Sequence, residues 1–364
     1  MRILAFTSGY DGCGYYRISL MAKYLNKLED FHVKVTTEYK PSEIEKADIL
    51  ILQKQVNTKA LKYVEYAKKL GKKVVTEVDD DYFNIPKSNP AYKYYVNRKD
   101  DLIAFYKASD ALTVSTPHLA VQLGKFNPNV YSIPNSLDFK FLDSFKSMGD
   151  EELYRHVKYF TKDNKEITRE DVTKMQEGKT VIGWGGSPTH YDDLKQVSST
   201  LIDICKEDPS VLLVMMACST QDILDEVPKD QLVLVAPSPI FLYPKNLSVQ
   251  NWDIGLCPIQ DNIFNKSKSN LKYLEFASNK FACICSDVEN YSNTVTDGET
   301  GLLSSNDPES WYSAITKLRD NVDLRKSIAE KGYSFVRENY NMGNNYKNWL
   351  TVYRDILGKG DQND

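Results

Sequence analysis

The stretch that most constrains the fold of this chain covers residues 253–303. An apolar run at 254–259 is followed by a polar loop and then by a segment of helical spacing at 267–277. A second apolar run, at 281–285, comes directly after it. Strand, helix and strand in this order need a crossover connection, so the stretch predicts a βαβ unit with two parallel strands.

The loop of this unit carries residue types that suit an anionic ligand. Loops at the carboxyl ends of parallel strands are where such sheets bind ligands. Lys268, Ser269 and Asn270 stand at the start of the predicted helix, and the free amides and dipole of a helix N-terminus attract anions. Glu275 follows in the helix, where a carboxylate can accept hydrogen bonds from sugar hydroxyls. A capped surface helix with ordinary lysines explains the same residues equally well.

Strand and helix patterns alternate along the rest of the chain. Strands are predicted first at 2–7, 31–37, 49–52, 73–78, 111–115 and 130–133, and later at 180–184, 211–217 and 232–236. After Gly301 the apolar stripes have helical spacing. The alternation predicts an α/β protein with two doubly wound parallel sheets.

Composition agrees with a globular protein of two domains. The chain has 364 residues, 41% hydrophobic and 26% charged. No apolar run approaches the ~20 residues of a membrane span, and the first residues lack signal-peptide features, so we expect a cytoplasmic protein. The six cysteines are scattered without a CxxC pair or a histidine cluster, which predicts reduced thiols and no structural zinc. A net charge of −4 gives no general attraction to nucleic acid.

Two glycine-rich turns after predicted strands are candidate phosphate-binding loops. The first, at 8–17, lacks the spacing of a dinucleotide fingerprint. The second follows the strand at 180–184 and contains Gly185, Gly186 and Ser187. Glycine lets the backbone approach a ligand closely, and tight structural turns use it for the same reason.

Four acidic residues stand where the predicted strand 73–78 ends: Glu77, Asp79, Asp80 and Asp81. They could hold a metal, supply the general base that deprotonates an acceptor, or form a solvated capping turn. Like charges this close raise one another's pKa, which suits a base. Because alternate strand residues share a face, we expect Asp79 and Asp81 to act rather than Asp80.

Two further segments differ from their surroundings. Residues 91–107 interleave basic and aromatic side chains, a pattern that fits nucleic-acid or glycan binding as well as an amphipathic helix. Residues 139–178 are dense in charge and show no strand pattern, which predicts a largely helical insertion between domains.

These motifs together resemble those of GT-B glycosyltransferases, in the family 4 and family 1-like group and of bacterial or phage type. The matching pieces of the C-terminal half are Pro258, Phe264, Lys268, Ser269, Glu275, Ala277, Ser286, Asp297-Gly298 and Gly301-Leu302. The N-terminal half is similar at Gly14 and Arg17 and at the strings EVDDDYFNIP, TVSTP and IPN. The chain departs from the family at Ser267, where many members have the first acid of an E-x7-E pair.

The resemblance implies a GT-B fold, in which two Rossmann-like doubly wound parallel-sheet domains face a cleft and the last helix crosses back to the N-terminal domain. The expected boundaries are 1–138 for an acceptor domain, 139–178 for the charged insertion and 179–342 for a nucleotide-sugar-binding domain. Residues 343–364 would form the returning helix and a disordered tail.

The resemblance also implies an activity, transfer of a sugar from a nucleotide sugar to a hydroxyl acceptor. A UDP-sugar is the first expectation for the donor, with no metal, because lysines would neutralise the departing diphosphate. The implied donor contacts are Gly14, Arg17, Gly185, Gly186, Ser187, Lys268, Ser269, Asn270 and Glu275. The implied catalytic or acceptor-binding residues are Asp11, Asp79 and Asp81.

Several alternatives stay open from the sequence. The acceptor is a surface glycan, a protein or, given the phage-type similarity, a hydroxymethylated DNA base. A GT-B-shaped epimerase or phosphorylase, or a non-catalytic carbohydrate-binding protein, would carry many of the same motifs. Donor sugar, stereochemical outcome and oligomeric state are not determined.

Overall fold

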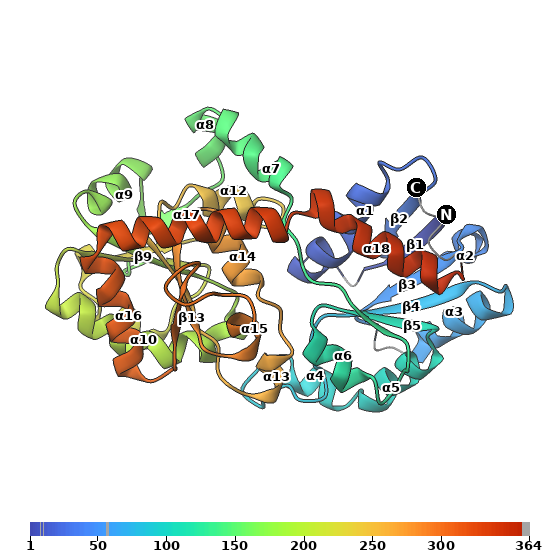
Figure 1. The fold of residues 1–364 in the computed structure, drawn as a ribbon. Coiled ribbons are helices and arrows are strands. Elements are labelled where there is room, and N and C mark those ends of the chain that lie inside the picture. The colour runs from blue at the N-terminus through green and yellow to red at the C-terminus, as the bar shows by residue number, and fades with distance from the viewer. Residues whose placement is uncertain (8, 10, 56–57, 359–364) are drawn as a thin grey trace. The chain divides into compact units, whose positions relative to one another are not determined.

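The computed structural model describes residues 1–7, 9, 11–55 and 58–358, and the chain divides into two units. Unit 1 contains Met1–Phe139, Lys266–Ser269 and the chain from Tyr340 onwards. Unit 2 contains Lys140–Asn265 and Asn270–Asn339. Each unit has its own sheet (Figure 1). The predicted disordered tail, 359–364, lies outside the described residues.

The sheet of unit 1 has the strand order β2-β1-β3-β4-β5-β6, and every pair is parallel. The strands are β1 (Arg2–Phe6), β2 (His32–Thr36), β3 (Ile49–Gln53), β4 (Lys73–Val78), β5 (Ala111–Val114) and β6 (Val130–Ser132). All six predicted strands of this half are confirmed. The central strands are buried along their length, because helices cover both faces of a parallel sheet.

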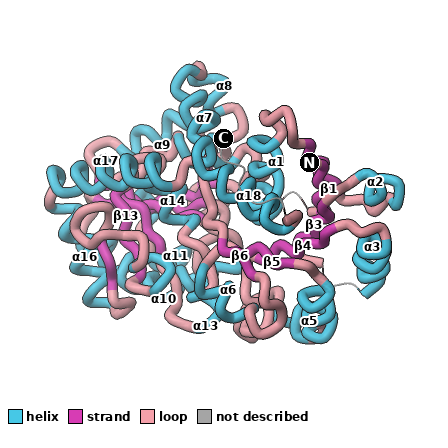
Figure 2. The backbone as a smooth tube through the Cα atoms, turned by 45° about the vertical axis from the view of Figure 1, so that its right-hand side comes forward, coloured by secondary structure: helices cyan, strands magenta, loops and turns pink. Residues whose placement is uncertain are grey.

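The helices of unit 1 come from both ends of the chain. They are η1 (Gly14–Ser19), α1 (Leu20–Leu25), α2 (Pro41–Lys46), α3 (Thr58–Lys69), α4 (Tyr92–Val96), α5 (Lys99–Ala108), α6 (Pro117–Leu123) and α18 (Met342–Ile356). The C-terminal helix α18 lies beside α1 (Figure 2). Its Trp349 and Tyr353 are buried there, which confirms the predicted return of the last helix to the N-terminal half.

The sheet of unit 2 has the order β14-β13-β12-β9-β10-β11-β7-β8. The strands are β7 (Tyr159–Phe160), β8 (Glu166–Ile167), β9 (Thr180–Gly185), β10 (Val211–Met216), β11 (Leu232–Val235), β12 (Ile254–Cys257), β13 (Ala282–Ser286) and β14 (Leu302–Ser304). β12 and β13 pair in parallel, with Ile254 opposite Ala282. The βαβ unit predicted from 253–303 is therefore confirmed.

The helices of unit 2 include the longest of the described chain. They are α7 (Phe139–Ser144), η2 (Phe145–Ser147), α8 (Asp150–Tyr154), α9 (Arg169–Gln176), η3 (Pro188–His190), α10 (Tyr191–Glu207), α11 (Gln221–Glu226), η4 (Lys229–Gln231), α12 (Tyr243–Ser248), α13 (Ile263–Lys266), α14 (Leu271–Ala277), α15 (Glu289–Ser292), α16 (Pro308–Asp320) and α17 (Val322–Asn339). None of the described helices is long and apolar enough to pass through a membrane.

The charged segment 139–178 corrects one expectation. It contains the predicted helices, but it also contains β7 and β8, which extend the sheet of unit 2 in antiparallel fashion from β11. Each of these strands has only two residues, and only Tyr159 among the four is buried. Strands this short carry too few side chains to show a period of two in the sequence.

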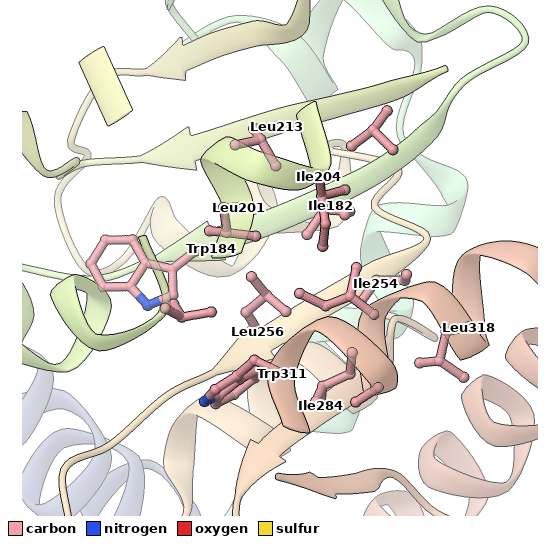
Figure 3. Close-up of a cluster of buried hydrophobic side chains, with 14 of the residues drawn as sticks. Ile182, Trp184, Leu201, Ile204, Leu213, Ile254, Leu256, Ile284, Trp311 and Leu318 are labelled. Carbon is pink, nitrogen blue, oxygen red and sulfur yellow. The ribbon is translucent and has the colours of Figure 1, made fainter. Parts of the chain in front are cut away.

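Apolar side chains fill the space between the sheet of unit 2 and helices α10 and α16 (Figure 3). Trp184 and Trp311 are the largest side chains of this core. On the opposite face, Gly183 leaves room for Trp252, because a Cβ there would lie 1.7 Å from the indole ring. Trp252 meets Phe276 of α14 edge to face at 5.2 Å. This packing seats α14 over β12 and thereby positions Glu275.

Candidate functional site

The carboxyl end of β9 carries the glycine turn predicted to bind a diphosphate. A Cβ at Gly186 would lie 2.8 Å from the Trp184 ring and 3.1 Å from Nζ of Lys272, so only glycine fits without displacement. Lys272 of α14 donates a hydrogen bond to the carbonyl of Gly185. The ammonium therefore lies directly at the turn, although the sequence analysis did not select Lys272.

Lys272 could have been found by its spacing. It stands four residues after Lys268, and residues at this spacing share a helix face. The sequence predicts a helix over 267–277, whereas α14 begins at Leu271. The helical lysine is thus Lys272, one turn further on.

The other residues of the glycine turn are exposed or bonded locally. The Ser187 hydroxyl lies 2.7 Å from that of Thr189. Nδ1 of His190 lies 2.9 Å from Asp193, which is buried. The second oxygen of Asp193 accepts from the amide of Gln260 at 3.0 Å and from Asn265 at 3.1 Å. Asp193 therefore ties the loop after β9 to the loop after β12.

Glu275, the residue predicted to hold the donor ribose, is partly exposed on α14. It accepts a hydrogen bond from the hydroxyl of Tyr243 at 3.1 Å. Burial and the Glu275 carboxylate raise the pKa of Tyr243 well above its usual value, so this phenol stays protonated and donates. Tyr243 is the first residue of α12, the helix that follows β11.

Asn270 has a structural partner in unit 2. Its side-chain amide donates to the hydroxyl of Thr294 at 3.0 Å, and its backbone carbonyl accepts from the backbone amide of Leu274 at 3.2 Å. The side chain therefore joins the start of α14 to the segment after α15. Its predicted donor contact stays a prediction.

The short segment Lys266–Ser269 has its contacts in unit 1. The carbonyl of Ser267 accepts from Thr116 at 2.9 Å, and the hydroxyl of Ser269 accepts from Asn135 at 2.8 Å. Nζ of Lys268 lies 3.6 Å from the carboxylate of Asp80. Ser267, which stands where many GT-B members have an acid, is fully buried. The predicted donor residues Lys268 and Ser269 thus belong to a different unit from Glu275.

The acidic cluster of unit 1 is organised by a lysine that the sequence analysis missed. Lys54 follows β3, and its Nζ lies 3.3 Å from Asp79 and 3.7 Å from Asp11. Its backbone is left-handed, with φ of 51°, a conformation that costs a non-glycine residue free energy and is often found at functional sites. The hydroxyl of Tyr82 donates to the other oxygen of Asp79 at 2.6 Å.

The neighbouring aspartates have different charge preferences. Burial alone would raise the pKa of Asp79, but Lys54 and hydrogen bonds from Cys13 and Tyr82 outweigh it and lower the pKa. Burial raises the pKa of Asp80, with Asp79 adding to the effect and Lys268 opposing it. Burial would lower the pKa of Lys54, yet Asp79 and Asp11 raise it overall. The expectation that the neighbouring acids raise one another's pKa is therefore wrong for Asp79, whose pKa is lowered, and Asp79 is the stable carboxylate of the pair.

The structure removes the reason for grouping Asp81 with Asp79. β4 ends at Val78, so the three aspartates are not strand residues and do not alternate between faces. Asp81 is buried and accepts from the amide of Phe83 at 3.1 Å and from the side chain of Asn84 at 2.7 Å. Asp81 thus caps a turn, as one alternative from the sequence had it, but the side chain is buried and not solvated.

Gly14 and Arg17 lie in η1, a π-helical turn inside unit 1. Arg17 is 1% exposed and donates to Glu77 at 2.6 Å and to the carbonyl of Ile133 at 2.5 Å. Its guanidinium also lies 4.7 Å from the ring of Trp349. To contact a donor phosphate, Arg17 would have to leave the buried carboxylate of Glu77. The geometry gives Arg17 a structural position.

Gly14 supports Asp11 rather than the arginine. Its amide donates to Asp11 at 2.8 Å, and Asp11 is 54% exposed. Within the described residues, no cluster of three or more histidine, cysteine, aspartate or glutamate side chains is arranged to hold a metal ion.

Comparison with known sequences gives one short similarity. The chain is 32% identical over 77 residues to an uncharacterised glycosyltransferase of Methanocaldococcus jannaschii. The match covers 21% of this chain and only 20% of that relative. No family model matches the chain.

Comparison with solved structures gives matches over nearly the whole chain. A glycosyltransferase from Rickettsia africae aligns with a TM-score of 0.66 at 16% identity, over 98% of both chains. Anabaena HepE, solved with UDP and glucose, aligns at 0.65 and 9% identity over 97% of this chain and 99% of that one. A protein described as a UDP-N-acetylglucosamine 2-epimerase from Listeria monocytogenes aligns at 0.58 and 10% over 100% and 98%. Together with the two parallel-rich sheets, these matches show that the chain has the two-domain Rossmann-like GT-B fold.

Proposed function

We propose that the protein is a nucleotide-sugar-dependent glycosyltransferase, with a UDP-sugar as its donor. The observation that carries the proposal is the arrangement at the carboxyl ends of β9 and β12. Lys272 and Glu275 both lie on helix α14. The Lys272 ammonium lies at the Gly185-Gly186 turn, and Glu275 accepts a hydrogen bond from Tyr243 of α12. A cation beside exposed backbone suits a diphosphate, and a carboxylate suits ribose hydroxyls.

In the proposed donor complex, each residue has a separate role. Lys272 and the amide of Ser187 bind the diphosphate, and Glu275 accepts hydrogen bonds from the ribose. The amide of Gly186, also predicted to bind the diphosphate, instead donates to the carbonyl of Met216 at 3.2 Å. The predicted contributions of Lys268, Ser269 and Asn270 stay part of the proposal. The positive charge of lysine would stabilise the leaving diphosphate, so we expect no metal to be needed.

The proposed reaction transfers the sugar to a hydroxyl group. A bond forms between the acceptor oxygen and the anomeric carbon, and the bond from that carbon to the diphosphate oxygen breaks. The acceptor proton passes to a carboxylate, for which we propose Asp79. Lys54 and Tyr82 keep Asp79 ionised and oriented, and Asp11 accepts a hydrogen bond from the acceptor.

Titration with UDP, GDP and ADP by isothermal calorimetry, each with and without EDTA, tests the donor site. We expect one nucleotide to bind selectively and independently of EDTA. Lys272→Met should weaken that affinity by about tenfold or more, the loss of one charge-assisted contact. Glu275→Gln should weaken the binding of nucleoside diphosphates and of nucleosides by the same factor.

Lys280→Met is the matched control, because Lys280 lies after α14 and pairs with Glu330 at 2.7 Å at the surface. Its nucleotide affinity should equal that of the wild type. If none of the three nucleotides binds, the proposed function is rejected. Binding that survives in Lys272→Met would remove Lys272 from the donor site without rejecting the function.

A second candidate function is nucleotide-sugar epimerisation, favoured by the fold shared with the Listeria protein. The two activities differ in their need for an acceptor. Incubation of UDP-N-acetylglucosamine and UDP-glucose with the protein alone, followed by chromatography of the nucleotide sugars, separates them. An isomerised nucleotide sugar supports the epimerase, whereas sugar transfer only after an acceptor is added supports the transferase.

A further inference from the structure

The end of the unit 1 sheet combines hydroxyl-binding groups that the donor site does not use. Asp79 keeps a defined orientation, because Lys54 and Tyr82 hold its two oxygens. Asp11, on the neighbouring loop, lies within 3.7 Å of the same lysine and is more than half exposed. Two carboxylates fixed around one ammonium are well placed to accept hydrogen bonds from neighbouring hydroxyls of one ligand.

A buried amide beside this cluster also points to a ligand. Gln53 is the last residue of β3 and precedes Lys54. Its side-chain oxygen accepts from Thr7 at 2.8 Å, but its Nε2 has no hydrogen-bond partner within the described part of the chain. Gln53 is fully buried, and an unsatisfied buried donor costs free energy. A ligand oxygen at this sheet end would satisfy it.

An aromatic wall stands next to the carboxylates. The rings of Tyr82 and Tyr95 stack with centroids 4.2 Å apart and an interplanar angle of 13°. Tyr94 meets Tyr95 edge to face at 5.0 Å and is 49% exposed. Burial raises the pKa of Tyr95 to about 12, and Lys54, Asp79 and Asp80 also act on it electrostatically, which places it near the cluster. Flat rings beside fixed hydroxyl acceptors are the surface that a pyranose ring fits.

The charges around the wall disfavour a phosphate-bearing acceptor. Nucleic-acid binding depends on cations that neutralise phosphates. Here Lys54 and Lys268 are paired with Asp79 and Asp80. The guanidinium of Arg98 lies over the Tyr94 ring at 4.0 Å and donates to the Tyr94 carbonyl at 2.7 Å.

Another basic side chain of this segment is also engaged. Lys99 donates to the carbonyl of Phe83 at 2.9 Å. Arg98 and Lys99 are therefore not open cations, whereas Lys93 and Lys107 of the segment 91–107 are exposed. At the sheet end itself, a polyanion would meet the carboxylates of Asp11 and Asp80.

We infer that this end of the unit 1 sheet is a subsite for a neutral carbohydrate acceptor, whose ring stacks on the Tyr94–Tyr95 wall while its hydroxyls bond to Asp79, Asp11 and Gln53. The inference rests on the proposed function and names its acceptor class: a glycan rather than a hydroxymethylated DNA base. Lys54 and Tyr82 are positioning residues of this subsite, since each acts through Asp79.

Binding to an array of neutral and acidic glycans, with and without UDP, tests the inference. We expect the wild type to bind neutral glycans. Tyr95→Leu, which removes the ring, should weaken this binding by about tenfold, the effect of losing an aromatic stacking contact together with its buried area. Tyr95→Phe, which keeps the ring, should retain it. All variants should bind UDP as tightly as the wild type.

Tyr312→Phe and Tyr312→Leu form the control pair, because Tyr312 is a partly exposed tyrosine on α16 of unit 2. Neither should alter glycan binding. A duplex containing 5-hydroxymethylcytosine is the competing probe, measured by fluorescence anisotropy at about 50 and about 200 mM salt. We expect the wild type and Tyr95→Leu not to differ in their binding of this duplex.

Three results would overturn the inference. The first is a wild-type protein that binds no glycan, and the second is equal glycan binding by Tyr95→Leu. The third is tight, salt-sensitive binding of the duplex that Tyr95→Leu abolishes. UDP binding is read separately, so loss of the acceptor inference is distinguishable from failure of the proposed transferase.

Discussion

Arg17 and Glu77 form an ion pair in the interior of unit 1. The two side chains are at most 1% exposed and their charged atoms are 2.6 Å apart. Glu77 also accepts from Thr113, and Arg17 from η1 reaches the segment after β6. The pair therefore connects the first loop, the centre of the sheet and, through Trp349, the C-terminal helix.

Glu77→Ala should lower the free energy of unfolding by about 3–5 kcal/mol, because it leaves a guanidinium buried without its carboxylate. The double variant Arg17→Met/Glu77→Leu removes both charges and should lose much less. Urea unfolding monitored by circular dichroism measures both. The single variants Arg17→Met and Glu77→Leu are measured in the same way. If the double variant loses as much free energy of unfolding as these two together, burial of an unpaired charge is not the cause.

Gly14 is required by the path of the loop that carries Asp11. A Cβ at Gly14 would lie 2.2 Å from the carbonyl oxygen of Gly9 and 2.8 Å from the Thr7 hydroxyl. Gly14→Ala should therefore cost about 1–3 kcal/mol of unfolding free energy, as overpacking does, and displace Asp11.

Gly9→Ala is the matched control in the same loop, since no atom lies within 4 Å of the added Cβ. In thermal unfolding, Gly14→Ala should have a lower midpoint temperature than Gly9→Ala. If both alanines are tolerated equally, the loop is not held in the position that the structure gives it.

At the scale of elements, one surface ion pair joins α7 to α17 within unit 2. Arg337 contacts both oxygens of Asp143, at 2.6 and 3.1 Å. The hydrogen bond from Arg337 lowers the pKa of Asp143 to about 2. The folded-state pKa is thus below the unfolded value of about 3.9, so the pair stabilises the protein at higher pH.

The contribution of this pair should be full above pH of about 5 and lost as the pH falls towards 2. Asp143→Asn should therefore be less stable than the wild type at neutral pH and nearly equal to it in strong acid. Because both side chains are more than a third exposed, the difference should be a fraction of a kcal/mol. If the difference in unfolding free energy between the wild type and Asp143→Asn grows as the pH falls, the predicted direction of the pH dependence is wrong.

At the scale of the whole chain, unit 1 is completed by the last helix. α18 supplies Trp349 and Tyr353 to its interior, and Leu137 and Asn341 form a backbone bridge before it. Deleting the chain from Tyr340 onwards should unfold unit 1, because a stripe of buried aromatic surface is lost. Unit 2 contains Lys140–Asn265 and Asn270–Asn339 and should keep its structure.

Hydrogen exchange on the truncated protein would check this prediction. We expect loss of protection in β1, β3 and β4 while β9, β10 and β12 stay protected. Uniform loss of protection in both units would mean that they do not fold separately. A truncated protein with protected unit 1 strands would show that α18 is dispensable.

Apolar runs bounded by glycine and polar turns were enough to predict nine strands of the two sheets and the βαβ unit of β12, α14 and β13. Continuous burial on both faces makes such strands visible in the sequence. β7 and β8 were missed, because two residues carry no period. β14 (Leu302–Ser304) was also missed, because the chain after Gly301 was predicted to be helical and a three-residue strand is too short to show a strand pattern. The returning helix α18 was inferred from the GT-B resemblance and not from its amphipathic stripe, which does not specify a partner.

Most of the elements, the parallel sheets and the loops at their carboxyl ends follow from the local spacing of apolar residues along the chain. Which polar side chains meet depends on how the chain folds in three dimensions. Folding paired Arg17 with Glu77 and Lys54 with Asp79, put Asp81 in a turn and brought Lys272 to Gly185. Such pairings join residues far apart in the chain, and the charge of a lysine or aspartate in the sequence does not reveal which partner folding brings within 3–4 Å of it.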